Sequence, residues 1–90
     1  MATASRKHAD FVSQPMGTKM SDALPGIGDA LGSRLAERGF ERAYMVLGRY
    51  LVLGRDKVRF NRWLHETCRA NEEQQRDCHR AIQEWCNSNV

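Results

Sequence analysis

The sequence predicts an all-α fold, a small five-helix domain, on three observations. Apolar residues recur three and four positions apart along most of the chain, which is the spacing of an amphipathic helix. The chain has only two prolines, and neither glycine nor proline follows Gly54, so the last third should be nearly all helix. Its 90 residues make one domain, expected to span residues 1–90. A domain this small buries a modest core, which a partner subunit would extend.

The first helix is expected to be short. Its apolar face is formed by His8, Phe11 and Val12. The helix should end near Pro15-Met16-Gly17, because the residue before a proline disfavours helical geometry. Residues 17–24 should form a loop with a single turn near Ser21.

The second helix is expected to start after Gly28 and to end at Gly39. Ile27, Leu31 and Leu35 lie four residues apart and therefore share one face. Gly39 occupies the place where a helix commonly ends in a left-handed residue, a conformation that glycine adopts without strain.

The third segment, residues 43–53, is rich in β-branched and aromatic residues that also occur in strands. We predict a helix, because no second strand is available to pair with it. Its apolar side chains would lie on most of its sides: Tyr44, Leu47 and Leu51 on one, and Val46, Tyr50 and Leu53 on another. Such a helix must be covered all round, which favours a second subunit. Gly48 costs about 1 kcal/mol here relative to alanine, and close approach of another helix would explain it.

The last two helices carry regular apolar stripes. The fourth should run from about Asp56 to Cys68, with an inner stripe of Phe60, Trp63, Leu64 and Thr67. The fifth opens with Asn71 as N-cap and Gln74 three residues later, a variant of the capping box. Its core stripe is formed by Cys78, Ala81, Ile82, Trp85 and Cys86.

The charge and the hydropathy exclude several classes of protein. The net charge of +3 is mild and permits an anionic partner. Residues 41–62 are the most basic stretch, with six basic side chains against two acidic ones. The apolar runs are too short for a signal peptide or a bilayer span, so we expect an intracellular protein without membrane insertion.

The cysteines and histidines indicate no enzyme, cofactor or metal centre. An odd number of cysteines without a CxxC pair disfavours a disulfide framework and a zinc site, so we expect core residues at Cys68, Cys78 and Cys86. The histidines are scattered along the chain, and we expect exposed rather than catalytic side chains at His8, His65 and His79. Glu72 and Glu73 fall in the first turn of the fifth helix, where they serve the helix dipole.

The segment Leu24-Pro25-Gly26-Ile27-Gly28 is the candidate binding site. Two glycines around Ile27 leave the backbone N–H groups at the start of the second helix uncovered, and such groups bind phosphate. Lys7 and Arg34 would add charge from the sides, while Asp29 would compete with a phosphate. Such a site contacts the DNA backbone rather than the bases, although the same glycines also fit a plain turn.

Further motifs carry a family resemblance over nearly the whole chain. They include Lys7-His8-Ala9-Asp10-Phe11-Val12, Gly26-Ile27-Gly28, Glu37-Arg38-Gly39-Phe40, Val46-Leu47-Gly48, Trp63-Leu64, Arg76-Asp77-Cys78 and Glu84-Trp85-Cys86. On these residues the chain resembles the barrier-to-autointegration factor family, with a helix-hairpin-helix motif at about residues 20–39.

The resemblance implies a homodimer that binds double-stranded DNA without sequence preference. Each subunit of that family carries one helix-hairpin-helix site, and the two sites face apart, so the dimer bridges two duplexes. The implied role is chromatin organisation and nuclear envelope assembly, in the nucleus and the cytoplasm. The implied partners are LEM-domain proteins of the inner nuclear membrane, with lamins and histones in addition.

Site residues follow from the resemblance position by position. The DNA-binding residues would be Ser5, Arg6, Lys7, Gly26, Gly28, Ala30, Leu31, Arg34 and Arg76. The dimer and partner surface would involve Phe40, Gly48, Val52 and Leu53. Phosphorylation would fall on Thr3 and Ser5, where the added negative charge would repel DNA.

The chain departs from the family pattern at several positions, among them Ala2 and Ala4, which reduce the number of hydroxyls available for phosphorylation. Glu72 and Glu73 stand where the family commonly has Ala and Lys beside the DNA, and Arg59 replaces an apolar residue on the side that meets LEM domains. Two alternatives therefore stay open. One is a diverged dimeric adaptor that binds LEM-domain or lamin-type nuclear proteins with weakened DNA affinity. The other is a hairpin module of a repair or recombination enzyme.

Overall fold

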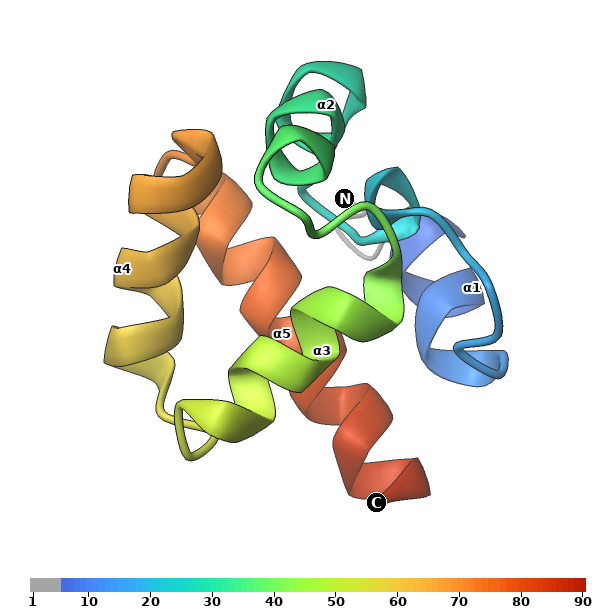
Figure 1. Ribbon diagram of the computed structural model, residues 1–90. Helices are drawn as coiled ribbons and strands as arrows, with labels where there is room; N and C mark the ends of the chain where they lie inside the picture. Colours follow the sequence, from blue (N-terminus) through green and yellow to red (C-terminus); the bar gives the residue numbers. More distant parts are fainter. Residues whose placement is uncertain (1–5) are drawn as a thin grey trace.

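The structure is a computed structural model that describes residues 6–90. Over this range the chain forms five α-helices and one 3-10 turn and contains no strand, which confirms the all-α prediction (Figure 1). The elements are α1 (Arg6–Ser13), η1 (Ser21–Ala23), α2 (Asp29–Glu37), α3 (Ala43–Val52), α4 (Lys57–Cys68) and α5 (Glu72–Asn89). No helix in the described range is long and apolar enough to cross a membrane.

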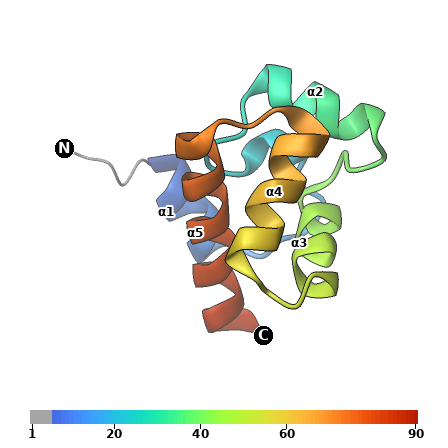
Figure 2. The same ribbon diagram turned by 90° about the vertical axis from the view of Figure 1, so that its left-hand side faces the viewer.

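Helix α5 is the central element of the fold. It is 18 residues long, and both α1 and α4 pack along it. Figures 1 and 2 both place α1 and α4 on different sides of α5. Helix α2 contacts α4 and η1, and α3 contacts η1, so these shorter elements close the core above and beside the central helix.

The core draws side chains from every helix. Its largest fully buried members are Leu24, Ile27, Leu35, Val46, Tyr50, Phe60, Leu64 and Ile82. Tyr50 and Phe60 meet edge to face, with ring centroids 5.1 Å apart, and this contact joins α3 to α4. Cys68, Cys78 and Cys86 are buried as well, which confirms that the cysteines are core residues.

The ends of α2 and α5 follow the sequence signals. Gly39 has φ +90° and its N–H donates to the carbonyl of Ala36 at 3.0 Å, while the N–H of Phe40 donates to the carbonyl of Leu35 at 2.8 Å. These two bonds form the Schellman motif that ends α2. At the start of α5, Asn71 and Gln74 exchange the two bonds of a capping box, each 2.8 Å long.

Helix α3 is buried on one face only. Ala43, Val46 and Tyr50 face the core, whereas Val52 is 75% exposed and Leu51 is exposed beside it. An added Cβ at Gly48 would meet no atom within 4 Å in the described part of the chain. The apolar outer face of α3 is therefore uncovered within one subunit.

Of the three histidines predicted to be exposed, His65 is exposed and His8 is half-buried, and the prediction is wrong for His79. This side chain is only 6% exposed and meets Tyr50 edge to face at 5.6 Å, so the imidazole serves as an aromatic core residue. Its Nε2 has no hydrogen-bond partner in residues 6–90. Burial, followed by the charge of Lys57, lowers the pKa of His79 below its ordinary value of 6.5.

The sequence also gave no sign of an antiparallel bridge between Met20 and Arg42. The N–H of Ser21 donates to the carbonyl of Glu41 at 2.9 Å, and the N–H of Ala43 donates to the carbonyl of Lys19 at 2.8 Å. This bridge ties the segment before the glycine turn to the start of α3.

Candidate nucleic-acid interface

The glycine-rich segment forms a tight turn that leads into α2. The N–H of Ile27 donates to the carbonyl of Leu24 at 3.0 Å, and Gly26 has φ +84° at the third position of the turn. Proline at the second position and a positive φ at the third are the pattern of a type II turn. Leu24 and Ile27 are fully buried and anchor the turn in the core.

Gly26 is required by packing as well as by its backbone conformation. A Cβ added there would lie 2.5 Å from the carbonyl oxygen of Gln74 and 3.2 Å from Cβ of Asp77. The turn therefore lies directly against the first turns of α5. This contact brings the segment of residues 20–39, called the hairpin below, next to α5. Helix α5 also carries Arg76, which is exposed.

Gly28 has no such requirement within the described residues. Its φ of −99° and ψ of −165° suit any residue, and an added Cβ would meet nothing within 4 Å. It is the N-cap of α2, where Ser, Asp or Asn would supply a side-chain acceptor that Gly28 lacks. The N-terminus of α2 is therefore open at Gly28, and no side chain at this position covers the backbone.

The amide groups that follow Gly28 are available to a ligand. The first helical bond of α2 runs from the N–H of Gly32 to the carbonyl of Gly28, at 2.8 Å. The N–H groups of Asp29, Ala30 and Leu31 precede this bond and have no acceptor within residues 6–90. The side chain of Leu31 is buried, so Leu31 can offer only its main-chain N–H to a ligand. These donors lie at the positive end of the helix dipole and suit a phosphate.

Lys7 lies at the hairpin. Its ammonium group donates to the carbonyl of Ile27 at 2.6 Å, which connects α1 to the turn across 20 positions of sequence. Arg6, the first residue of α1, is exposed. Among the predicted site residues, Lys7 is thus bonded to the turn that contains Gly26 and leads to Gly28, and Arg76 lies on the helix against which this turn packs.

Arg34 has a structural contact of its own. Its Nη1 donates to the carbonyl of Cys68 at 3.1 Å, so the guanidinium group caps the end of α4. The sequence placed Arg34 two turns beyond the glycines, but it could not show that this side chain is bound to another helix. Ser5 and Thr3 lie outside the described residues.

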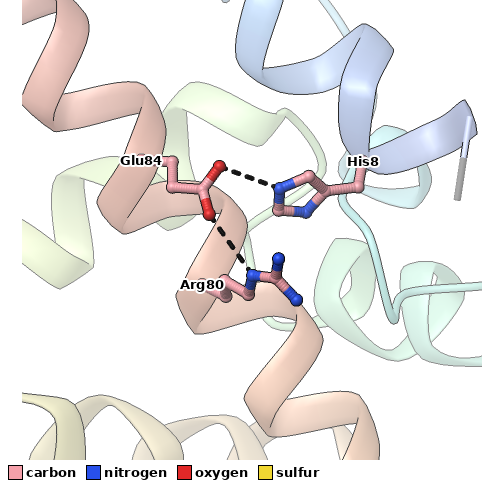
Figure 3. A network of polar contacts seen from close by, with 3 residues as sticks. All are labelled: His8, Arg80 and Glu84. Atoms are coloured by element: carbon pink, nitrogen blue, oxygen red, sulfur yellow. Dashed lines mark hydrogen bonds and ion pairs between the residues drawn. The ribbon is translucent and has the colours of Figure 1, made fainter. Parts of the chain in front are cut away.

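Three side chains fix α1 against α5 (Figure 3). Nε2 of His8 lies 3.0 Å from Oε1 of Glu84, and Nε of Arg80 lies 3.3 Å from Oε2 of the same carboxylate. The hydrogen bond with His8 is the main cause that lowers the pKa of Glu84. Sequence reasoning missed this network, although the spacing of Arg80 and Glu84 is that of a helical ion pair. The network supports the helix that presents Lys7.

Carboxylates also border the hairpin. Asp29 begins α2, and Glu72 and Glu73 occupy the first turn of α5, as predicted. Asp77 lies beside Gly26 through its Cβ. The local charge is therefore mixed, and the free amides and Lys7 supply the attraction for an anion.

The predicted partner residues divide into two groups. Gly48, Val52 and Leu53 belong to α3 or follow it directly, on or beside the uncovered apolar face. Phe40 lies elsewhere and is half-buried, with its ring 4.9 Å from that of Trp63 in an edge-to-face contact. The guanidinium of Arg49 lies 5.6 Å from the Phe40 ring.

The described residues contain no group of three or more His, Cys, Asp or Glu side chains that could hold a metal ion. Burial raises the pKa of the thiols of Cys68, Cys78 and Cys86, so these side chains are kept as neutral thiols. They are packing residues.

Comparisons with known proteins agree on one family. The family profile described as Barrier to autointegration factor matches residues 2–89. The barrier-to-autointegration factor of Mus musculus is 54% identical over 86 residues, which cover 96% of this chain and 97% of the relative. That of Danio rerio is 53% identical over 88 residues, with 98% of both chains covered. The relative of the same name from Drosophila melanogaster is 46% identical over 86 residues, 96% of each chain.

Proposed function

The chain belongs to the barrier-to-autointegration factor family, and from this premise we propose that it is a homodimer that binds and bridges double-stranded DNA without sequence preference. Residues 20–39 serve as the helix-hairpin-helix motif of a single domain spanning residues 1–90. The function is binding and bridging, with no catalytic step and no cofactor.

Gly28 is the observation that carries the proposal. Neither the packing nor the backbone conformation of residues 6–90 requires glycine at this N-cap, where Ser, Asp or Asn would add a side-chain acceptor. A phosphodiester that approaches the N–H groups of Asp29, Ala30 and Leu31 supplies a reason for glycine there. Contacts of this kind read the backbone of DNA and do not discriminate sequence.

Basic side chains surround that phosphate site. Lys7 is held at the turn by its bond to the Ile27 carbonyl, and its exposed ammonium can also reach a ligand. Arg76 comes from α5 beside Gly26, while Ser5, Arg6 and Arg34 complete the proposed DNA-binding set.

Bridging requires two hairpins in one particle. The uncovered apolar face of α3, with Gly48 and Val52, is the surface proposed for the second subunit. An apolar helix face of this kind favours a subunit contact over exposure to water. Leu53, which follows α3, and Phe40, which lies apart from this surface beside Trp63, are proposed to bind partner proteins.

The cellular role follows as part of the proposal. A DNA-bridging dimer of this family would act in chromatin organisation and nuclear envelope assembly, in the nucleus and the cytoplasm. LEM-domain proteins, lamins and histones are its proposed partners. Phosphorylation of Thr3 or Ser5 would place about two negative charges near the DNA and release it.

One observation favours a second candidate, a dimeric adaptor for LEM-domain or lamin-type proteins with weakened DNA affinity. Glu72 and Glu73 occupy the first turn of α5, which packs on the hairpin through Gln74. Two carboxylates at this edge repel phosphates and would reduce the affinity for DNA.

A titration of duplex DNA with the purified protein tests the proposal. Gly28→Glu should abolish most of the binding, because its carboxylate occupies the phosphate position, while α2 keeps a permitted N-cap conformation. Ala36→Glu makes the same charge change on the exposed side of α2 and is the matched control. Equal binding by both variants would contradict the proposal. Weak DNA binding by the unmodified protein, with retained LEM-domain binding, would favour the adaptor.

A further inference from the structure

The basic stretch noted in the sequence has a part that the hairpin does not use. Two of its arginines have contacts within the protein, since Arg42 donates to the carbonyl of Thr18 and Arg49 lies over the rings of Phe40 and Trp63. The remaining basic side chains lie on or beside α4. Between residues 55 and 69 the chain has five basic and two acidic residues, and the rest of the chain has nine of each. The whole net charge of the protein therefore resides in this segment.

Four arginines lie on α4 or directly beside its ends. Phe60, Leu64 and Cys68 face the core and are fully buried, which fixes the opposite direction as outward. On a helical projection, Arg59 and Arg62 point outward. Arg69 follows the last residue of α4, and Arg55 precedes its N-cap, with its guanidinium group bonded to Asn87 of α5. We call these four residues the arginine face, which follows a helix of 12 residues and is about 18 Å long.

The arginine face has few counter-ions. Arg59, Arg62 and Arg69 take part in no ion pair or side-chain hydrogen bond within residues 6–90, and all three are exposed. Arg55 makes a single hydrogen bond, to Oδ1 of Asn87 at 3.1 Å. Glu66 is the acidic residue on the same side, and no ion pair of the described part of the chain includes it. The positive charges are therefore not neutralised by the protein.

The local arrangement opposes stability in the isolated chain. Lys57 and Arg59 lie in the first turn of α4, where the helix dipole disfavours positive charge, and the acidic group at this helix end is the N-cap Asp56, which accepts from the N–H of Arg59 at 2.9 Å. Arg59 and Arg62 repel each other at helical spacing. Local unfavourable choices of this kind mark binding sites, where a ligand compensates for them.

The backbone gives an independent indication. In residues 6–90, the non-glycine residues with positive φ are Arg55, at +59°, and Arg69, at +66°. Both belong to the arginine face, and both occupy left-handed positions that glycine would fill without strain. The chain therefore keeps two guanidinium groups at the ends of α4 at a conformational cost.

We infer that the arginine face is a second nucleic-acid contact, which binds the phosphate backbone of duplex DNA independently of the hairpin. All four residues are arginine, whose planar group binds phosphate with two parallel hydrogen bonds. The face lacks the aromatic anchor that dominates protein interfaces, which disfavours an acidic protein segment as its ligand. Lys7 of the hairpin contact lies on α1, which α5 separates from α4 (Figure 2), whereas α2 packs against α4. The inference rests on the proposed DNA binding and extends it.

The test is a duplex DNA titration at several salt concentrations. Arg59→Gln combined with Arg62→Gln should weaken binding about tenfold or more and reduce the salt slope of log K by about 1.8, because two phosphate contacts are lost. Lys19→Gln combined with Arg42→Gln changes the net charge equally, outside both the arginine face and residues 20–39, and should leave the slope nearly unchanged. Equal effects of the two pairs would overturn the inference.

Two further variants keep the result interpretable. Arg69→Gly should raise the midpoint of thermal unfolding, because glycine relieves the left-handed strain, and yet weaken DNA binding. In the Gly28→Glu variant, residual DNA binding should persist, and it should vanish when Arg59→Gln and Arg62→Gln are added.

If Gly28→Glu has no effect, the proposed function fails. If it abolishes all binding while the arginine pair has no effect, only this inference fails. The double arginine variant could instead lose binding to polyglutamate and keep its binding to DNA. That result would assign the arginine face to an acidic protein segment and overturn the inference as well.

Discussion

Two glycines of the hairpin illustrate how single residues acquire different roles. The sequence predicted a turn with two bare positions, and both Gly26 and Gly28 fitted that description. Only the fold separates them, because Gly26 packs on the carbonyl of Gln74 whereas Gly28 faces open space. A contact across almost 50 positions of sequence cannot be derived from local pattern. Gly26 thus has a structural role and Gly28 is free to serve a ligand.

Gly26→Ala should destabilise the fold strongly. Alanine at φ +84° costs about 1–2 kcal/mol, and its Cβ would clash with the Gln74 oxygen at 2.5 Å, so α5 must shift as well. We expect the free energy of unfolding in urea to fall by at least about 2 kcal/mol. Gly28→Ser is the matched control and should keep the stability or raise it, because serine is a good N-cap. Equal stability of the two variants would refute this distinction.

At the scale of helices, the sequence predicted most of the fold. Apolar periodicity gave all five helices, and cap signals placed the start of α5 and the end of α2 within a residue. These features depend on neighbours within one or two turns. The bridge between Met20 and Arg42, the burial of His79 and the left-handed Arg55 depend on packing between distant segments, and the sequence did not reveal them.

The packing of α5 on α3 and α4 should depend on pH through His79. Its pKa is lowered in the folded protein, so between the unfolded value near 6.5 and the lower folded value only the unfolded chain is protonated. The free energy of unfolding should therefore be unaffected by His79 above pH 6.5 and decrease as the pH falls below it. The cause is burial without a partner for Nε2.

His79→Phe should remove this dependence. Phenylalanine keeps the aromatic contact with Tyr50 and deletes the unpaired nitrogen, so stability should rise by about 1 kcal/mol at pH 7 and by more at pH 5.5. Urea unfolding at the two pH values measures both effects. Glu84 loses its contribution only at more acidic pH, below its ordinary value of 4.5, which separates the two groups. If His79→Phe shows the same difference in the free energy of unfolding between the two pH values as the unmodified protein, His79 is not the titrating group.

For the whole molecule, the sequence and the fold indicate the same missing partner. The apolar residues of the third helix predicted that a second subunit covers this helix. In the single chain the outer face of α3 is exposed. The predicted binding residues also separate at this scale. Lys7 on α1 meets the turn that holds Gly26 and Gly28, and Arg76 belongs to the helix on which that turn packs, while Arg34 is bound to α4. Helical periodicity indicated which side of a helix is polar, but not which other helix its side chains contact.

Val52→Glu should separate the subunits without unfolding them. Val52 is 75% exposed in the single chain, so its replacement is tolerated by the fold, whereas a buried unpaired carboxylate in the dimer is strongly unfavourable. We expect the dissociation constant of the dimer to rise about a hundredfold or more, measured by sedimentation or light scattering. Val90→Glu changes another exposed valine near the end of α5 and should leave the oligomeric state unchanged. A variant at Val52 that dimerises normally would move the subunit contact away from α3.

The central position of α5 has a consequence for the order in which the molecule opens. Helix α1 has eight residues, buries Phe11 alone among them, and makes its main contact with α5. It can therefore detach while α3, α4 and α5 remain packed, and its amide protons should exchange with solvent long before those near Ile82. Each detachment of α1 withdraws the ammonium of Lys7 from the glycine turn. The lifetime of a protein–DNA complex should therefore depend on how often α1 detaches.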